Sequence, residues 1–140
     1  MSLKLSNRQI KNYYFLNRLL LKMQENSINS KKTVTQIFHQ DFILFLNLLK
    51  THNIIDSYKL KYSKNKPNKT IEINLNENFS FTYYAELNIL TLIELKALNI
   101  STKTTIFLHT DQGLMSLTQC ITKNITNSSI VFEIKKNRVE

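Results

Sequence analysis

The sequence predicts an α+β protein with two small lobes. Three observations lead to this fold class: an apolar stripe at helical spacing near the N-terminus, stretches of alternating polar and apolar residues in the middle, and a strand, polar loop, glycine and helix start near the C-terminus. The 140 residues suit one domain, or two small lobes that share a core. We expect an N-terminal α/β lobe over residues 1–76, a linker over residues 77–84 and a C-terminal β-rich lobe over residues 85–140.

The N-terminal lobe opens with a predicted helix that runs to about Glu25. Ser6 and Gln9 have the spacing of a capping box, in which each side chain satisfies a free backbone N–H of the first turn. The residues that share one apolar face are Tyr13, Leu16, Leu20 and Met23. A turn over residues 26–30 follows, and the β-branched run over residues 33–37 predicts a strand.

A second helix is predicted from His39 to His52, followed by a hairpin. Asn53 suits the left-handed conformation that ends many helices. Residues 54–62 and 71–75 alternate in polarity on either side of a basic turn, which is typical of an antiparallel hairpin. The lobe therefore has the predicted order helix, strand, helix, hairpin (α-β-α-β-β).

The C-terminal lobe is predicted to be mainly β, with one short helix. Residues 76–84 lack clear periodicity, and the spacing over residues 87–98 fits either a strand or a helix. The apolar strand over residues 106–108 leads to a polar tip, His109-Thr110-Asp111-Gln112, and then to Gly113, the only glycine of the chain. This glycine indicates either positive φ or a close approach to the backbone. Ser116 and Gln119 form a second capping box before a helix that ends near residue 124, and a strand follows over residues 129–135.

Composition restricts the possible functions. The formal net charge of +9 favours a polyanionic partner, most often a nucleic acid. A single cysteine excludes an internal disulfide and a multi-cysteine zinc site, and a single glycine excludes glycine-rich phosphate loops. His39, His52 and His109 have no metal-ligand spacing, and Cys120 lies on an apolar helix face. We therefore predict no enzyme, no metal, no cofactor, no small-molecule substrate and no membrane span.

The polar tip is predicted to contact RNA. The Thr110 hydroxyl suits the 2′-hydroxyls and base edges of a shallow RNA groove, and His109 and Gln112 can donate to phosphate or base acceptors. Asp111 suits a turn cap or an exocyclic amine, and Gly113 lets the backbone approach closely. The lysines expected to supply electrostatic attraction are Lys22, Lys31, Lys32, Lys61, Lys64 and Lys66.

Two stretches of the chain resemble one protein family. The first is Phe107-Leu108-His109-Thr110-Asp111-Gln112-Gly113-Leu114-Met115, followed by Cys120-Ile121. It resembles the signature of ribosomal protein eight of the small subunit, whose usual tip is Ser-Thr-Ser-Lys-Gly, and Thr110 and Gly113 match that tip. In the second stretch, Lys31 with Val34-Thr35 resembles the family's Asn-Lys-x-x-Val-Thr. There Leu46-Asn47-Leu48-Leu49-Lys50 resembles Ala-Asn-Val-Leu-Lys, and Asn53-Ile54-Ile55-Asp56 resembles Gly-Phe-Ile-Glu.

This resemblance, over about residues 20–60 and 104–134, implies a fold and a function. It implies a strand followed by a short helical turn over residues 87–98. It also implies a non-catalytic ribosomal protein that binds the central domain of small-subunit ribosomal RNA, aids its assembly and contacts neighbouring proteins, notably small-subunit protein five. The family's Ser-Arg-Pro-Gly-x-Arg segment is missing here. Two alternatives remain open: a basic RNA-binding module outside the ribosome, and a ribosomal protein held mainly by protein–protein contacts.

The expected compartment is the mitochondrion, with the protein encoded in the organelle. Many Asn, Lys and Ile residues beside few Gly, Ala and Pro indicate an A+T-rich gene, which is common in organelle genomes. The N-terminal residues lack the character of a presequence or signal peptide. A plastid is the less favoured expectation, because plastid relatives usually keep the Ser-Thr-Ser-Lys-Gly tip and the Arg-Pro-Gly segment.

Overall fold

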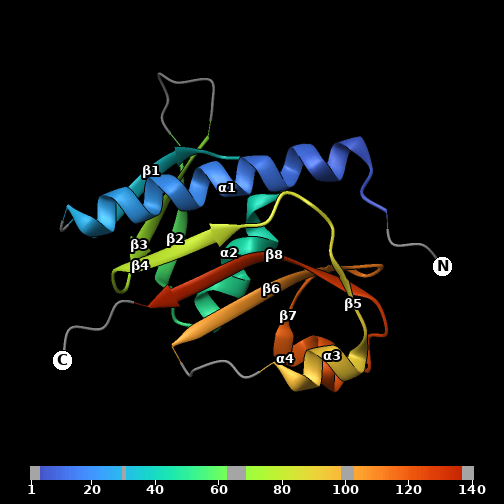
Figure 1. Cartoon of the computed structure of the whole chain (residues 1–140). Coiled ribbons are helices and arrows are strands. Elements are labelled where there is room, and N and C mark those ends of the chain that lie inside the picture. Colours follow the sequence, from blue (N-terminus) through green and yellow to red (C-terminus); the bar gives the residue numbers. More distant parts are fainter. Residues whose placement is uncertain (1–3, 30, 63–68, 99–102, 137–140) are drawn as a thin grey trace. The chain divides into compact units, whose positions relative to one another are not determined.

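The predicted α+β class is confirmed by the computed structural model, which describes residues 4–29, 31–62, 69–98 and 103–136 (Figure 1). Its helices and strands form two compact units. Unit 1 contains residues 1–13 and 80–135, and unit 2 contains residues 14–79 and 136–140. Over the described ranges, no helix has both the length and the apolar character needed to cross a membrane.

Helix α1 (Asn7–Ile28) begins and packs as its sequence predicts. The Ser6 amide donates to Gln9 Oε1 at 2.9 Å and the Gln9 amide donates to Ser6 Oγ at 3.1 Å, which confirms the first capping box. The predicted stripe of Tyr13, Leu16, Leu20 and Met23 is buried, together with Leu19. The helix runs three residues beyond the predicted end at Glu25. Its first residues, up to Tyr13, belong to unit 1, and the remainder belongs to unit 2.

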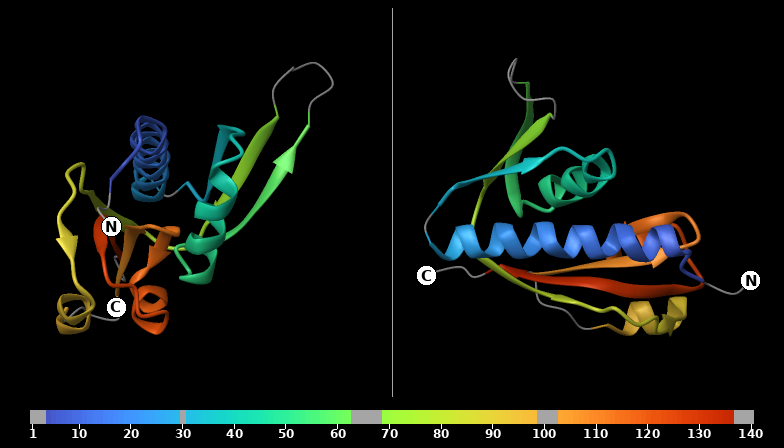
Figure 2. Two further views of the ribbon diagram at one scale, coloured as in Figure 1. Left: turned by 90° about the vertical axis from the view of Figure 1, so that its right-hand side faces the viewer. Right: turned by 90° about the horizontal axis from the view of Figure 1, so that it is seen from above.

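Unit 2 has the predicted α-β-α-β-β order. After α1 come β1 (Thr33–Ile37), α2 (Phe42–Thr51), β2 (Ile55–Lys61) and β3 (Thr70–Leu75). The strands form an antiparallel sheet in the order β1-β3-β2, and β2 and β3 form a long hairpin (Figure 2). Apolar residues of β3 alternate inward, with Ile71, Ile73 and Leu75 buried. Asn53 has φ 60, which confirms the left-handed end of α2.

Unit 1 contains a five-stranded sheet and two short helices. Its elements are β4 (Phe79–Tyr83), β5 (Ile89–Leu90), α3 (Leu92–Ala97), β6 (Thr104–Thr110), β7 (Gly113–Ser116), α4 (Leu117–Thr122) and β8 (Ser128–Lys136). The strand order is β4-β8-β6-β7, and β5 also pairs with β8. The expected strand and helical turn over residues 87–98 are confirmed as β5 and α3. However, β4 occupies most of the segment expected to be a linker.

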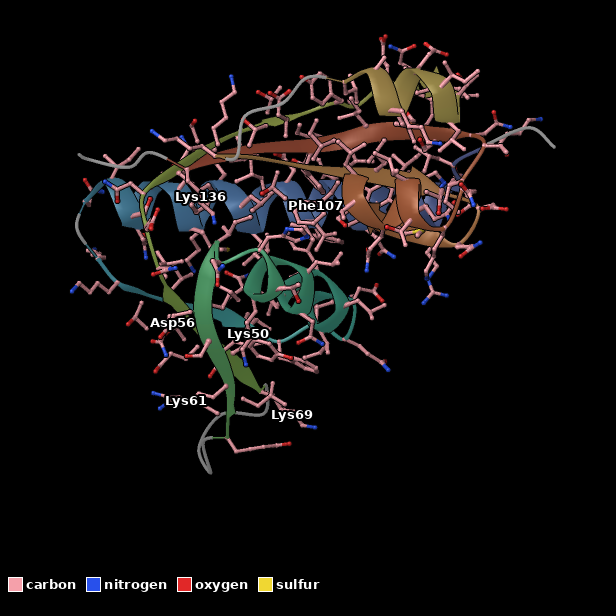
Figure 3. The ribbon with its side chains drawn as sticks, turned by 90° about the horizontal axis from the view of Figure 1, so that it is seen from below. Lys50, Asp56, Lys61, Lys69, Phe107 and Lys136 are labelled. Atoms are coloured by element: carbon pink, nitrogen blue, oxygen red, sulfur yellow. The ribbon has the colours of Figure 1, made fainter. Side chains whose placement is uncertain are left out.

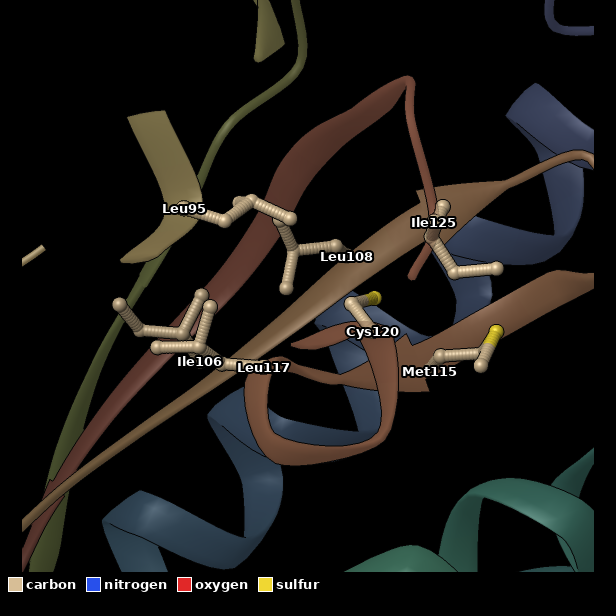
Figure 4. Packing of buried hydrophobic residues seen from close by; sticks show 7 residues of the cluster. All are labelled: Leu95, Ile106, Leu108, Met115, Leu117, Cys120 and Ile125. Carbon is tan, nitrogen blue, oxygen red and sulfur yellow. The ribbon is translucent and has the colours of Figure 1, made fainter. Parts of the chain in front are cut away.

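The core of unit 1 lies where β6, β7, α3 and α4 meet (Figure 4). Its buried residues are Leu95, Ile106, Leu108, Met115, Leu117, Cys120 and Ile125. Cys120 is fully buried, and burial raises the pKa of its thiol to about 11, so the thiol stays protonated at neutral pH. Cys120 therefore packs in the core, in agreement with its place on an apolar helix face. Alternate residues of β6 point to the opposite side, where Phe107 is also fully buried.

Candidate nucleic-acid interface

The polar tip is the turn of the β6–β7 hairpin. Thr110 pairs with Gly113 in the antiparallel register, so Asp111 and Gln112 alone join the two strands. Gly113 has φ 100, and a Cβ added there would have no described atom within 4 Å. Of the two reasons predicted for this glycine, positive φ is therefore confirmed, whereas no close approach by the described chain requires it. A left-handed residue after a tight turn is common in hairpins.

The Thr110 hydroxyl stabilises this turn from inside the protein. It donates to the Gly113 carbonyl oxygen at 2.9 Å and accepts from the Gln112 amide at 3.0 Å. Thr110 is 1% exposed, and its hydroxyl also lies 3.3 Å from the Met115 sulfur. The expected exposure of Thr110 is therefore wrong, because its hydroxyl satisfies two backbone groups that a tight turn would otherwise leave unpaired. Thr110 therefore has no exposed polar side-chain group for the predicted contact with RNA.

His109 is also buried, and its partner is Tyr13. The Tyr13 hydroxyl and His109 Nδ1 share a hydrogen bond of 2.5 Å, and the two rings meet edge to face with centroids 5.5 Å apart. His109 is 2% exposed, and burial lowers the pKa of its imidazole. Burial likewise raises the pKa of Tyr13, with a smaller contribution from Tyr83. Both groups are therefore neutral at physiological pH. His109 is corrected from an exposed contact residue to a buried polar residue.

Asp111 and Gln112 are the tip residues whose side chains are exposed. A carboxylate and a carboxamide offer one negative charge, several acceptors and a single pair of N–H donors. This chemistry suits a base edge or a 2′-hydroxyl better than a phosphate, which would be repelled by Asp111. The predicted tip site is therefore reduced to these two side chains and the backbone around Gly113.

The predicted lysines lie in unit 2, whereas the tip lies in unit 1. Lys31 and Lys32 are exposed beside the turn between α1 and β1. Lys22 is exposed too, but its ammonium donates to the Thr35 carbonyl oxygen at 2.8 Å and to Gln36 Oε1 at 3.0 Å. Since an ammonium has three N–H groups, Lys22 both holds α1 against β1 and keeps one donor. Lys64 and Lys66 lie outside the described residues.

The β2–β3 hairpin carries a basic surface of Lys59, Lys61 and Lys69, of which Lys61 was among the lysines expected to attract RNA. Lys61 and Lys69 are exposed where the two strands approach their connecting loop (Figure 3). Lys59 and Lys61 contact Glu72, and the hydrogen bond from Lys61 is the main cause of the lowered Glu72 pKa. The Lys69 ammonium lies 5.1 Å from the centre of the exposed Tyr62 ring. The alternation that places Lys59 and Lys61 on the solvated side of β2 was the available sequence signal.

Among the described residues, no group of three or more His, Cys, Asp or Glu side chains could hold a metal ion. Within unit 2, several exposed cations can bind a polyanion, although each of them is individually screened by solvent. No protein-family model matches the chain, and no curated protein sequence matches it either.

Proposed function

We propose that the protein is a structural component of the small ribosomal subunit that binds ribosomal RNA. The observation that carries the proposal is that two residues of the β6–β7 hairpin form the turn while two others are exposed. Thr110 and Gly113, the two tip residues that match ribosomal protein eight of the small subunit, are those that shape the turn. Asp111 and Gln112, which differ from the family's Ser-Lys pair, are exposed. The chain thus keeps the turn-forming residues of that signature but exposes different side chains.

The electrostatics support RNA as the partner. The chain carries a formal net charge of +9, and Lys31, Lys32, Lys61 and Lys69 are exposed. Each of these contributes little singly, but several cations that neutralise phosphates together release counterions and give salt-dependent affinity. Because the tip has lost the family's lysine at Gln112, we assign the attraction to unit 2 and the groove contacts to the tip.

The proposed role is assembly rather than catalysis. The protein would bind the central domain of small-subunit RNA, help it fold and contact neighbouring proteins, small-subunit protein five among them. A mitochondrial ribosome is the proposed compartment, because the composition indicates an A+T-rich gene. The strand β5 followed by the short helix α3 agrees with what the family resemblance implies for residues 87–98.

Sedimentation of the tagged protein with ribosomal particles tests this proposal. The protein should migrate with the small subunit and stay there after a high-salt wash. The variant Lys31→Ala/Lys32→Ala should dissociate at lower salt, because each lost phosphate contact reduces the slope of log affinity against log salt by about 1. Lys96→Ala, which removes an exposed lysine of α3, is the matched control and should behave as wild type. Migration apart from the subunit before the wash would refute the proposal.

A further inference from the structure

Four aromatic rings of unit 2 form a continuous series from the core to the surface. Phe42, at the start of α2, is buried, and its ring centroid lies 5.6 Å from that of His39. The His39 imidazole stacks on Phe15 at 6.1 Å with an interplanar angle of 29°. Phe15 in turn contacts Tyr14 at 6.5 Å. We name Tyr14, Phe15 and His39 the ring cluster.

The ring cluster is exposed although its members are large and flat. Tyr14 is 50% exposed and Phe15 39% exposed, and the His39 side chain is about half exposed. Both α1 residues fall outside the buried stripe that includes Leu16 and Leu20. Exposed aromatic rings next to one another are unusual on a surface that needs no partner, since part of the apolar surface of each ring remains in water.

Hydrogen bonds hold His39, one member of the ring cluster, in place before any ligand arrives. The Phe42 amide donates to the His39 carbonyl oxygen at 2.9 Å, and the Asp41 amide donates to His39 Nδ1 at 3.2 Å. On the other side of this loop, the Phe38 amide donates to the Lys69 carbonyl oxygen at 2.9 Å. Since Nδ1 accepts, the neutral imidazole carries its proton on Nε2, where it can donate to a ligand. A ring fixed in this way loses little side-chain entropy on binding.

Arg18 adds a positive charge to the face of α1 that carries Tyr14 and Phe15. Arg18 is exposed and follows Phe15 by three residues and Tyr14 by four, so all three share one face of α1. Among the described residues, no hydrogen bond or ion pair engages the Arg18 guanidinium. The Asp41 carboxylate lies 3.5 Å from His39 Nδ1, on the ring edge away from Nε2. A guanidinium one helical turn from flat rings is the combination that binds the phosphate and the base of one nucleotide.

We infer that the ring cluster is a stacking site for unpaired bases of a single-stranded RNA segment, with Arg18 as its phosphate-binding residue. The inference deepens the proposed function and rests on it. Aromatic faces accept any base, so the site would add affinity for an unpaired loop or bulge without reading its sequence. It also explains why Phe15 and Tyr14 remain exposed beside a basic side chain, which a purely apolar protein-docking surface would not require.

Binding of two fluorescein-labelled RNA oligonucleotides by fluorescence anisotropy tests the inference. One is a single strand of about 12 nucleotides, and the other is the same strand with abasic sugars at its central positions. Tyr14→Ala and Phe15→Leu should each weaken binding of the intact strand about 5- to 100-fold, while binding of the abasic strand changes less than twofold. Phe15→Leu keeps an apolar side chain against His39, so its effect reports the flat ring rather than packing. Arg18→Gln should weaken binding of both strands and lower the salt slope by about 1.

The matched control is Leu44→Ala, which removes an exposed large apolar side chain from α2 in the same unit. It should bind both strands as wild type, and circular dichroism should show unchanged helix in all variants. If the two ring variants keep the wild-type preference for the intact strand while wild type still binds small-subunit RNA, the stacking site is refuted and the proposed function stands. Loss of subunit association without loss of RNA affinity would assign the rings to a protein partner and also refute it. Failure of wild type to bind any RNA would refute both proposals.

Discussion

Replacing Tyr13 by Phe isolates the buried hydrogen bond that anchors the hairpin strand β6. The substitution removes one hydroxyl and keeps the ring, so the edge-to-face contacts with His109 and with Phe132, whose centroid is 6.5 Å away, can remain. What disappears is the 2.5 Å hydrogen bond to His109 Nδ1. His109 is almost completely buried, so its ring nitrogen has no access to water as a substitute partner.

The expected cost follows from this burial. A buried acceptor or donor left without a partner costs about 1–3 kcal/mol, whereas replacing both partners with apolar side chains of similar shape is nearly neutral. Tyr13→Phe should therefore lower the free energy of unfolding by about 1–3 kcal/mol. The double variant Tyr13→Phe/His109→Leu should be more stable than Tyr13→Phe alone, because no unpaired nitrogen remains.

Urea unfolding monitored by circular dichroism at pH 7.5 measures both values. For a chain of this size, a cost of about 2 kcal/mol lowers the urea midpoint by about 1 M. The four proteins of the double-mutant cycle (wild type, the two single variants and the double variant) give the coupling energy of the pair. A Tyr13→Phe variant within about 0.5 kcal/mol of wild type, or additive effects in the cycle, would refute the reasoning that this pair is a buried, mutually dependent contact.

Three further predictions concern the same structure. Burial lowers the pKa of His109 and of His52 below the ordinary value of 6.5, the latter with a contribution from nearby Lys136. In acid, the unfolded chain then binds more protons than the folded chain. Stability should therefore be full above pH 6.5 and should fall as the pH drops through the folded-state pKa values of the two histidines. Urea midpoints at pH 7.5 and pH 5 measure this loss, and an unchanged midpoint would contradict it. Gly113→Ala should lower the free energy of unfolding by about 1–2 kcal/mol through its positive φ, without a steric clash, and equal stability by thermal unfolding would show that the turn relaxes. Ser116→Ala should cost about 1 kcal/mol by removing the capping box of α4; a shift in melting temperature of less than 1 °C would argue against the cap.

Local features of the fold were predictable because each depends on a few neighbouring residues. The capping boxes at Ser6 and Ser116 form as their spacing indicates. Asn53 and Gly113 adopt positive φ, as their residue types favour. The alternation of β3 and the apolar face of α1 likewise determine which residues are buried. In each case the physical cause lies within one turn, one strand or one helix.

Long-range features were not predictable in the same way. Tyr13 and His109 are 96 residues apart, and nothing near either one indicates the other. The tip was expected to expose every polar residue, but Thr110 is the last residue of β6 and its hydroxyl turns back onto the turn. Strand β4 was missed although Phe79, Phe81 and Tyr83 alternate with small polar residues. A short aromatic strand is recognised as such only when a partner strand, here β8, is known.

The measurement that tests the central claim most directly is RNA binding by the purified protein over a salt series. Small-subunit ribosomal RNA from the protein's own source should be compared with an unrelated structured RNA of equal length. The account predicts that preference for the small-subunit RNA survives at high salt, because groove and stacking contacts remain when counterion release is suppressed. Equal affinity for both RNAs, falling with the same steep salt slope, would contradict it and leave only a basic surface.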